Sequence, residues 1–127
     1  MLTFSGYVKD ILKQIKSSHE IFENLDDKPG DLDIMKKEWI KVDSLLNSLI
    51  KRIENSENTS DVYQNLAKKC KYYTENYYFH REIEIMSDLY ANDPHRLKNI
   101  RLKILESFND KKFMERITET IEKLEQM

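Results

Sequence analysis

The feature that most constrains this chain is a stripe of apolar residues in its second quarter, spaced alternately three and four positions apart. The stripe consists of Leu32, Met35, Trp39, Val42, Leu46, Leu49 and Ile53. Residues at this spacing lie on one face of an α-helix, and such a helix is stable when its apolar face packs against other helices. Similar stripes occupy most of the remaining sequence, so we expect an all-α fold.

Length and composition indicate one domain. The chain has 127 residues, of which 39% are hydrophobic and 35% are charged. A chain of this length falls within the usual size of a single domain and buries enough surface for one core. We therefore expect one helical-bundle domain over residues 1–127. The apolar residues are periodic and never form a long uninterrupted run, so neither a disordered chain nor a membrane protein is expected.

Charge and cysteine content narrow the class of protein. The formal net charge of -2 offers no overall attraction to nucleic-acid phosphates. Cys70 is the only cysteine, which excludes an internal disulfide and is typical of a reducing compartment. Lys9 and Asp10 interrupt the opening segment, where a signal peptide needs an apolar core. We expect a cytoplasmic protein with no membrane partner.

The bundle is expected to contain four to five helices joined by short polar loops. The first helix is predicted over residues 3–24, and a polar loop with a Pro-Gly pair follows over residues 25–33. Asp31 or Asp33 is expected to cap the second helix, which continues to about residue 55. Because the connection is short, the first two helices are expected to be antiparallel neighbours.

The third helix is expected to begin after Ser60, and its apolar positions change face near Asn76. The early positions are Tyr63, Leu66, Cys70, Tyr73 and Tyr77, and the later ones are Tyr72, Phe79, Ile83, Met86 and Tyr90. Either the helix bends or ends between Glu75 and His80, or one helix buries its two halves against different neighbours. Since no glycine or proline interrupts the segment, a continuous helix is favoured.

Two further helical segments are expected in the last third of the chain. Asp93 followed by Pro94 is a strong start signal for a helix that reaches about residue 109. Asp110 is the candidate cap of a fifth helix ending near residue 127, although the two segments could instead form one kinked helix. No segment shows the two-residue alternation of a strand, so no sheet is expected.

Residue types that usually build catalytic sites are scarce. Gly6 and Gly30 are the only glycines, and neither lies in a turn suited to an oxyanion hole or a phosphate loop. Cys70 lies on an apolar stripe, which favours a buried thiol over a reactive one. His80 and Glu84 are one helical turn apart, but two ligands do not make a metal site. We therefore expect a non-enzyme with no cofactor and no metal.

Residues 95–98 spell H-x-L-K. This segment resembles the phosphoacceptor segment of histidine phosphotransfer modules, which are helical bundles of comparable length. The resemblance covers four residues and implies that His95 carries a phosphoryl group that Lys98 helps to stabilise. Two features depart from the family: Pro94 places His95 in a first helical turn rather than in mid-helix, and Asn99 stands where the family has glycine.

The most unusual local composition lies in residues 68–81, where lysine and arginine alternate with aromatic residues. Tyrosine and arginine are enriched at the centres of protein interfaces because they bury a large area and keep a polar tip. We therefore predict a non-catalytic protein-interaction module, such as an adaptor, secretion-type chaperone, inhibitor or immunity-like protein. Its predicted partner-binding residues, the first three of which are expected to project from the bundle, are Tyr72, Tyr78, Arg81, Lys68 and Lys71.

Three alternatives remain open. In the first, Tyr73, Tyr77 and Phe79 belong to the core and the lysines are simply solvated. In the second, the basic runs 68–81 and 96–103 meet in space and bind nucleic acid. In the third, the broad apolar face of the second helix pairs with another copy of the chain as a homodimer.

Overall fold

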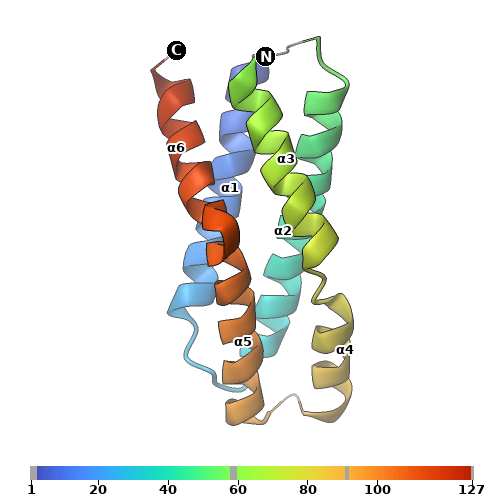
Figure 1. Ribbon diagram of the computed structural model, residues 1–127. Coiled ribbons are helices and arrows are strands. Elements are labelled where there is room, and N and C mark those ends of the chain that lie inside the picture. Colours follow the sequence, from blue (N-terminus) through green and yellow to red (C-terminus); the bar gives the residue numbers. More distant parts are fainter. Residues whose placement is uncertain (1–2, 58–59, 91, 127) are drawn as a thin grey trace.

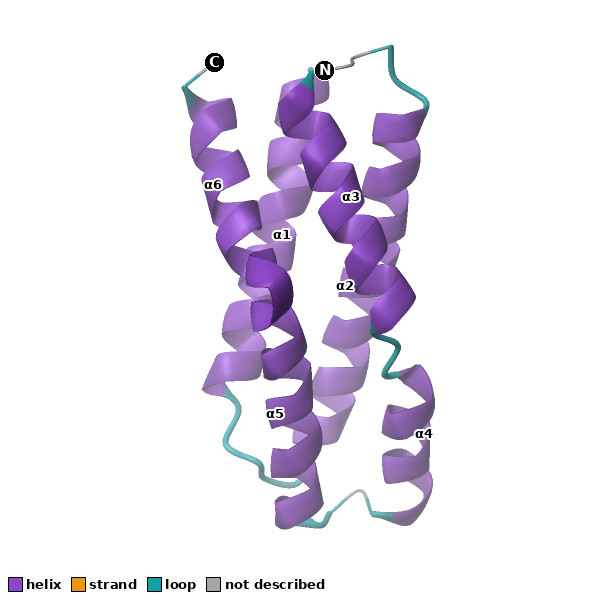
Figure 2. Cartoon of the chain, viewed as in Figure 1, coloured by secondary structure: helices purple, strands orange, loops and turns teal. Residues whose placement is uncertain are grey.

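The computed structural model describes residues 3–57, 60–90 and 92–126, and within them every regular element is a helix (Figure 1, Figure 2). The elements in chain order are α1 (Phe4–Asn24), α2 (Asp31–Glu54), α3 (Asp61–Asn76), α4 (His80–Leu89), α5 (Pro94–Asn109), the 3₁₀ turn η1 (Asp110–Lys112) and α6 (Phe113–Glu125). The predicted all-α bundle is confirmed. None of the described helices combines the length and the apolar character that a bilayer span requires.

The helices are arranged as four antiparallel rods (Figure 1). The first two rods are α1 and α2, the third is α3 continued by α4, and the fourth is α5 continued by α6. α2 packs on both halves of the third rod, and α1 packs on both halves of the fourth. Contacts of α3 with α6 and of α4 with α5 join the two interrupted rods, which closes the ring around one core.

At two of the predicted helix starts, the side chain of the N-cap residue accepts hydrogen bonds from backbone amides of the first turn. The hydroxyl of Thr3 accepts a hydrogen bond from the Gly6 amide at 3.0 Å, which caps α1. The carboxylate of Asp93 accepts from the amides of His95 and Arg96 at 3.0 and 3.3 Å, with Pro94 in the first turn of α5. Both caps satisfy amides that have no partner inside the helix.

The prediction that Asp31 or Asp33 caps α2 is wrong. Gly30 occupies the N-cap with φ 96°, a left-handed conformation that glycine adopts without steric cost. Asp31 is instead the first residue of the helix and is buried. Its carboxylate accepts from the amides of Asp26 and Lys28 at 3.0 and 3.2 Å, so it closes the preceding loop.

The same loop is tied to the fourth rod by a partly buried ion pair. The guanidinium of Arg101 donates two hydrogen bonds to the carboxylate of Asp27, at 2.7 and 3.0 Å. Two parallel bonds of this kind fix orientation as well as distance. A buried polar contact, from the Ser18 hydroxyl to the Glu38 carboxylate at 2.7 Å, joins α1 to α2.

Aromatic rings from all four rods fill the middle of the core. The Tyr73 ring stacks on Phe113 at 4.5 Å and on Phe108 at 5.6 Å between centroids, and its hydroxyl pairs with Ser107 at 2.8 Å. Trp39 contacts the same cluster from α2, and Phe22 from α1. All seven residues of the apolar stripe that predicted α2 are buried.

The prediction of one continuous third helix is wrong. α3 ends at Asn76, Tyr77 is extended with φ -130° and ψ 121°, and α4 begins at His80. The interruption accounts for the change of face in the apolar pattern of this segment. Tyr73 before it and Phe79 after it both contact the Trp39 ring, at 6.1 and 5.0 Å between ring centroids. The break in the helix lets the apolar residues on both sides of it face the core, which therefore buries more apolar surface than a straight helix could.

The fourth and fifth predicted helices are separate, as α5 and α6. Asp110 does not cap α6, because η1 lies between them and α6 begins at Phe113. Lys111 and Lys112 adopt left-handed backbone conformations, with φ 50° and 57°. Side chains with a Cβ atom rarely adopt such angles, so this turn is strained.

Replacing Lys112 with glycine is expected to stabilise the protein. Lys112 is exposed and holds φ 57°, where glycine avoids the steric cost of a Cβ atom. We expect Lys112→Gly to raise the free energy of unfolding by about 1 kcal/mol, measured by urea denaturation.

Lys37→Gly is the matched control, because Lys37 is an exposed lysine within α2. Glycine in a helix interior costs about 1 kcal/mol, so this variant is expected to be less stable than the parent. Equal destabilisation by both substitutions would contradict the strain assigned to Lys112.

Candidate binding site

The two interruptions of the rods lie side by side and share one carboxylate. The first is the segment 77–79 between α3 and α4, and the second is η1 between α5 and α6. The hydroxyls of Tyr72 and Tyr77 both donate to Oδ2 of Asp110, at 3.0 and 2.5 Å. Asp110 therefore links the end of α3 to the turn between α5 and α6.

Hydrogen bonding moves the pKa values of this cluster further from neutrality. The bond to Asp110 raises the pKa of Tyr77 to about 12 and also raises the pKa of Tyr72. The same bonds, that from Tyr77 first, lower the pKa of Asp110. The carboxylate is charged and both hydroxyls are neutral near pH 7, so the cluster is suited to anchoring the two rods and not to transferring protons.

A groove runs between α4 and α5 from these interruptions toward the end of the bundle. It consists of two hollows of about 660 and 710 Å³, and Glu82, Lys103 and Glu106 line both. Lys103 and Glu82 face each other across it, with Nζ 3.3 Å from Oε1. The second hollow, nearer the end of the bundle, is lined by Glu82, Ile85, Met86, Arg96, Asn99, Ile100, Leu102, Lys103 and Glu106. We call the two hollows together the α4–α5 groove.

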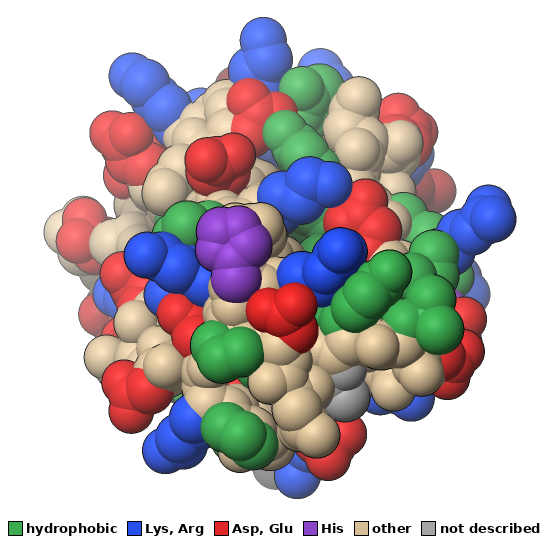
Figure 3. Space-filling model, turned by 90° about the horizontal axis from the view of Figure 1, so that it is seen from below, with side chains coloured by type: hydrophobic (Ala, Val, Ile, Leu, Met, Phe, Trp, Pro, Cys, Tyr) green, Lys and Arg blue, Asp and Glu red, His purple; other side chains and the backbone are tan. Residues whose placement is uncertain are grey.

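Large apolar side chains are exposed in and beside the α4–α5 groove. Ile85 and Leu102 line it and are 45% and 41% exposed, and Leu89, one turn beyond Ile85, is 68% exposed. Tyr78 lines the other end and is 65% exposed. Seen from this end of the bundle, hydrophobic side chains gather on the side where Figure 1 places α4, with charged side chains of both signs nearby (Figure 3).

The structure divides the five predicted partner-binding residues among different places. Tyr78 and Arg81 are exposed at the start of α4, as predicted. The prediction that Tyr72 projects from the bundle is wrong, because its ring is half-buried and its hydroxyl is bonded to Asp110. Lys68 and Lys71 are exposed on α3, and Lys71 pairs with Glu54 at 2.7 Å. These residues therefore do not form one surface.

The core assignment in the first alternative reading is partly correct. Tyr73 and Phe79 are buried in the aromatic core. Tyr77 is half-buried, with its ring packed on Tyr73 at 5.2 Å between centroids and its hydroxyl directed to Asp110. Aromatic residues adjacent in sequence thus serve different purposes, because the chain changes from helical to extended at Tyr77.

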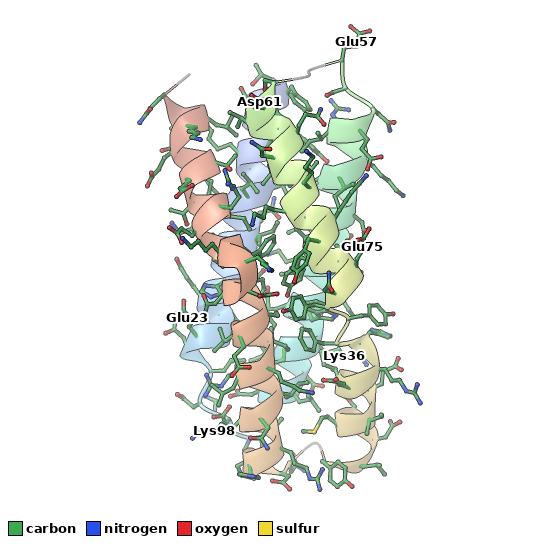
Figure 4. All side chains as sticks on the ribbon, viewed as in Figure 1. Glu23, Lys36, Glu57, Asp61, Glu75 and Lys98 are labelled. Atoms are coloured by element: carbon green, nitrogen blue, oxygen red, sulfur yellow. The ribbon has the colours of Figure 1, made fainter. Side chains whose placement is uncertain are left out.

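The lysines of the first basic run lie apart from the second run, whereas Arg81 of the first run lies on α4, which packs on α5. Lys68 and Lys69 lie beside the start of α6, whereas the second run follows α5 toward the opposite end, where Figure 4 labels Lys98, far from Asp61 at the start of α3. In the second run Arg101 is bonded to Asp27 and Lys103 to Glu82. These ion pairs lower the positive charge that the run offers to a phosphate backbone.

The other candidate chemical groups remain separate. Nε2 of His80 lies 2.8 Å from Oε1 of Glu84, and the described residues contain no cluster of three or more metal-ligating side chains. Cys70 is buried, and burial raises the pKa of its thiol to about 12. His95 is exposed in the first turn of α5, as expected from Asp93 and Pro94, and not in mid-helix as in the phosphotransfer family. That resemblance stays a prediction.

The exposed residues of α4 were not singled out from the sequence. Ile85 and Leu89 lie off the stripe formed by Ile83, Met86 and Tyr90, and Glu82, Ile85 and Leu89 recur at helical spacing. A second apolar stripe on a short helix is a signal of an additional contact surface. That stripe would have indicated the α4–α5 groove.

Comparisons with known proteins add no family. No protein-family model matches the chain, and neither a curated protein nor a solved structure is significantly similar to it. Any functional inference therefore depends on the geometry and chemistry of the surface.

The Asp110 cluster predicts a specific dependence of stability on pH. Because the folded pKa of Asp110 is lowered, its contribution is fully present above its ordinary pKa and is lost as the pH falls through the folded value. We expect Asp110→Asn to be less stable than the parent at pH 7, since a neutral amide accepts a weaker hydrogen bond. The difference should narrow as the pH is lowered toward 2, measured by urea denaturation. A difference that stays constant with pH would show that the Asp110 charge does not anchor the rods.

Proposed function

We propose that this chain is a non-catalytic protein-interaction module that holds an amphipathic helix of a partner protein in the α4–α5 groove. The observation that carries the proposal is the composition of α4. This helix exposes as many large apolar side chains, Ile85 and Leu89, as it buries, Ile83 and Met86. A short helix with one face in the core and a second apolar face in water is suited to covering by a partner.

The shape of the groove favours a helix as the ligand. Its walls are two helices, with Ile85 and Met86 of α4 on one side and Ile100 and Leu102 of α5 on the other, and lining residues such as Glu82 and Ile85, or Asn99 and Lys103, are three or four positions apart. Grooves of this kind accept the apolar face of an amphipathic helix, whose side chains recur at the same spacing. Charged residues of both signs at the margin would fix its orientation more than its affinity.

Tyr78 and Arg81 keep their predicted role in this proposal. Tyr78 lines the end of the groove near the interruption, and Arg81 is exposed one turn before Ile85. An exposed aromatic ring beside a cation is typical of the residues that contribute most to binding. An adaptor, chaperone, inhibitor or immunity-like protein would each use such a surface. The sequence expectation of a cytoplasmic location stays a prediction.

The proposal predicts that charge on the exposed face of α4 abolishes partner binding without unfolding the protein. In Ile85→Glu/Leu89→Glu both changes are at exposed positions, so the melting temperature should change little. Burial of each side chain in a complex contributes about 1.5–3 kcal/mol, so binding should weaken at least roughly 100-fold. Affinity capture from the native cell identifies the partner, and calorimetry with the purified partner measures the affinity.

Ile40→Glu is the matched control, because Ile40 is 47% exposed on α2 and lines neither hollow of the groove. Its partner binding should equal that of the parent. Retained binding in the α4 variant, or equal loss in both variants, would overturn the proposal. Sedimentation velocity is a further check, because a parent dimer that the α4 variant converts to monomers would assign the groove to a second copy of this chain instead.

A further inference from the structure

A further hollow, separate from the α4–α5 groove and on the other side of the interrupted rods, is lined by cations from three separate elements. It lies between α3 and α6, has a volume of about 530 Å³, and is lined by Asn65, Lys68, Lys69, Tyr72, Lys111 and Arg116. We call it the basic pocket. No aspartate or glutamate lines it, although the chain carries more acidic than basic residues, 23 against 21.

The cations of the basic pocket converge on one hollow whose lining holds no carboxylate. Some cations elsewhere pair with a carboxylate, as Lys13, Lys71 and Lys103 do at 3.0, 2.7 and 3.3 Å, and others do not. Within the part of the chain that the structure describes, neither Lys68 nor Arg116 forms an ion pair. Unpaired like charges that converge on one hollow repel each other, and an anion in the hollow would offset that repulsion.

Charge is segregated around α6. Its acidic residues Glu115, Glu119 and Glu122 line a different hollow, beside α1, whereas Arg116 turns toward α3. Asp110 is the nearest carboxylate in sequence, but its Oδ2 accepts both tyrosine hydroxyls and it lines the α4–α5 groove. Positive charge therefore predominates in the lining of the basic pocket, and the nearby Asp110 carboxylate, which is bonded to Tyr72 and attracted by Lys111, offsets only part of it.

The frame of the basic pocket is fixed by contacts between its elements. Nζ of Lys69 donates to the carbonyl oxygen of Lys111 at 2.8 Å, which joins α3 to the strained turn η1. The bond of Tyr72 to Asp110 joins the same two elements one turn further along. Lys69 uses one of its three donors in this bond, so the others remain for a ligand. A frame held in this way loses little conformational entropy on binding.

We propose that the basic pocket binds a ligand through a phosphate group. Arginine presents a planar fork that matches phosphate oxygens, and lysines add point charges around it. The volume lies within the range of small-molecule sites and leaves room for an organic group attached to the phosphate. A phosphorylated side chain of a partner protein presents the same chemistry as a free phosphate ester.

The test is a titration of the ¹⁵N-labelled full chain followed by NMR at fixed ionic strength, with pyrophosphate in one arm and a phosphoserine peptide in the other. We expect saturable shifts of the amides of Lys68, Lys111 and Arg116. Lys68→Gln/Arg116→Gln should weaken binding at least roughly tenfold, since the variant removes two charged hydrogen-bond donors. Lys111→Gly, which suits the positive φ of this position, should also weaken it and guards against misfolding of the first variant.

Lys37→Gln/Lys41→Gln is the matched control, because it removes two positive charges from exposed positions on α2, outside the basic pocket. Its affinity should stay within about twofold of the parent, since distant exposed charges are screened. Binding of pyrophosphate assigns the pocket to small phosphorylated molecules, and binding of the phosphopeptide alone assigns it to a phosphorylated partner. No saturable shift in either arm, or equal weakening in the control, would overturn the proposal. The Ile85→Glu/Leu89→Glu variant should bind as the parent does, which separates this proposal from that for the groove.

Discussion

The stacking of Tyr73 against Phe108 and Phe113 is the contact on which the rest of the bundle depends. These rings come from α3, α5 and α6, so one aromatic cluster joins the third rod to both halves of the fourth. Each aromatic pair adds stabilisation beyond the area that it buries. Because both interruptions adjoin this cluster, the chain can leave helical geometry there without opening the core.

A hollow of the surface adjoins each interruption of the rods. On one side α4 is displaced from the axis of α3, and the α4–α5 groove lies between it and the next rod. On the other side η1 directs Lys111 toward the lysines of α3, which forms the basic pocket. Asp110 lies between the two and bonds Tyr72, which lines the pocket, and Tyr77, which lines the groove.

The fold was predictable where a single stripe runs the length of a helix. The stripe of α2 and the start signal at Asp93 with Pro94 both depend on interactions within a few residues, which the sequence displays directly. The candidate site was much less predictable. Tyr78 and Arg81 were identified from composition, but Ile85 and Leu89 were not, because exposure depends on which face of α4 meets α2 and α5.

The sequence by itself determined that apolar faces recur at helical spacing, and hence that the chain forms a helical bundle. Tertiary structure alone decided that the third helix ends at Asn76, because only the position of Trp39 makes an extended Tyr77 favourable. It also decided that the Asp31 carboxylate accepts hydrogen bonds from amides of the preceding loop. Asp110 likewise accepts hydrogen bonds from two tyrosine hydroxyls instead of capping α6. Local preference determines which segments form helices. The partner of a polar side chain depends instead on which groups folding brings within hydrogen-bond distance.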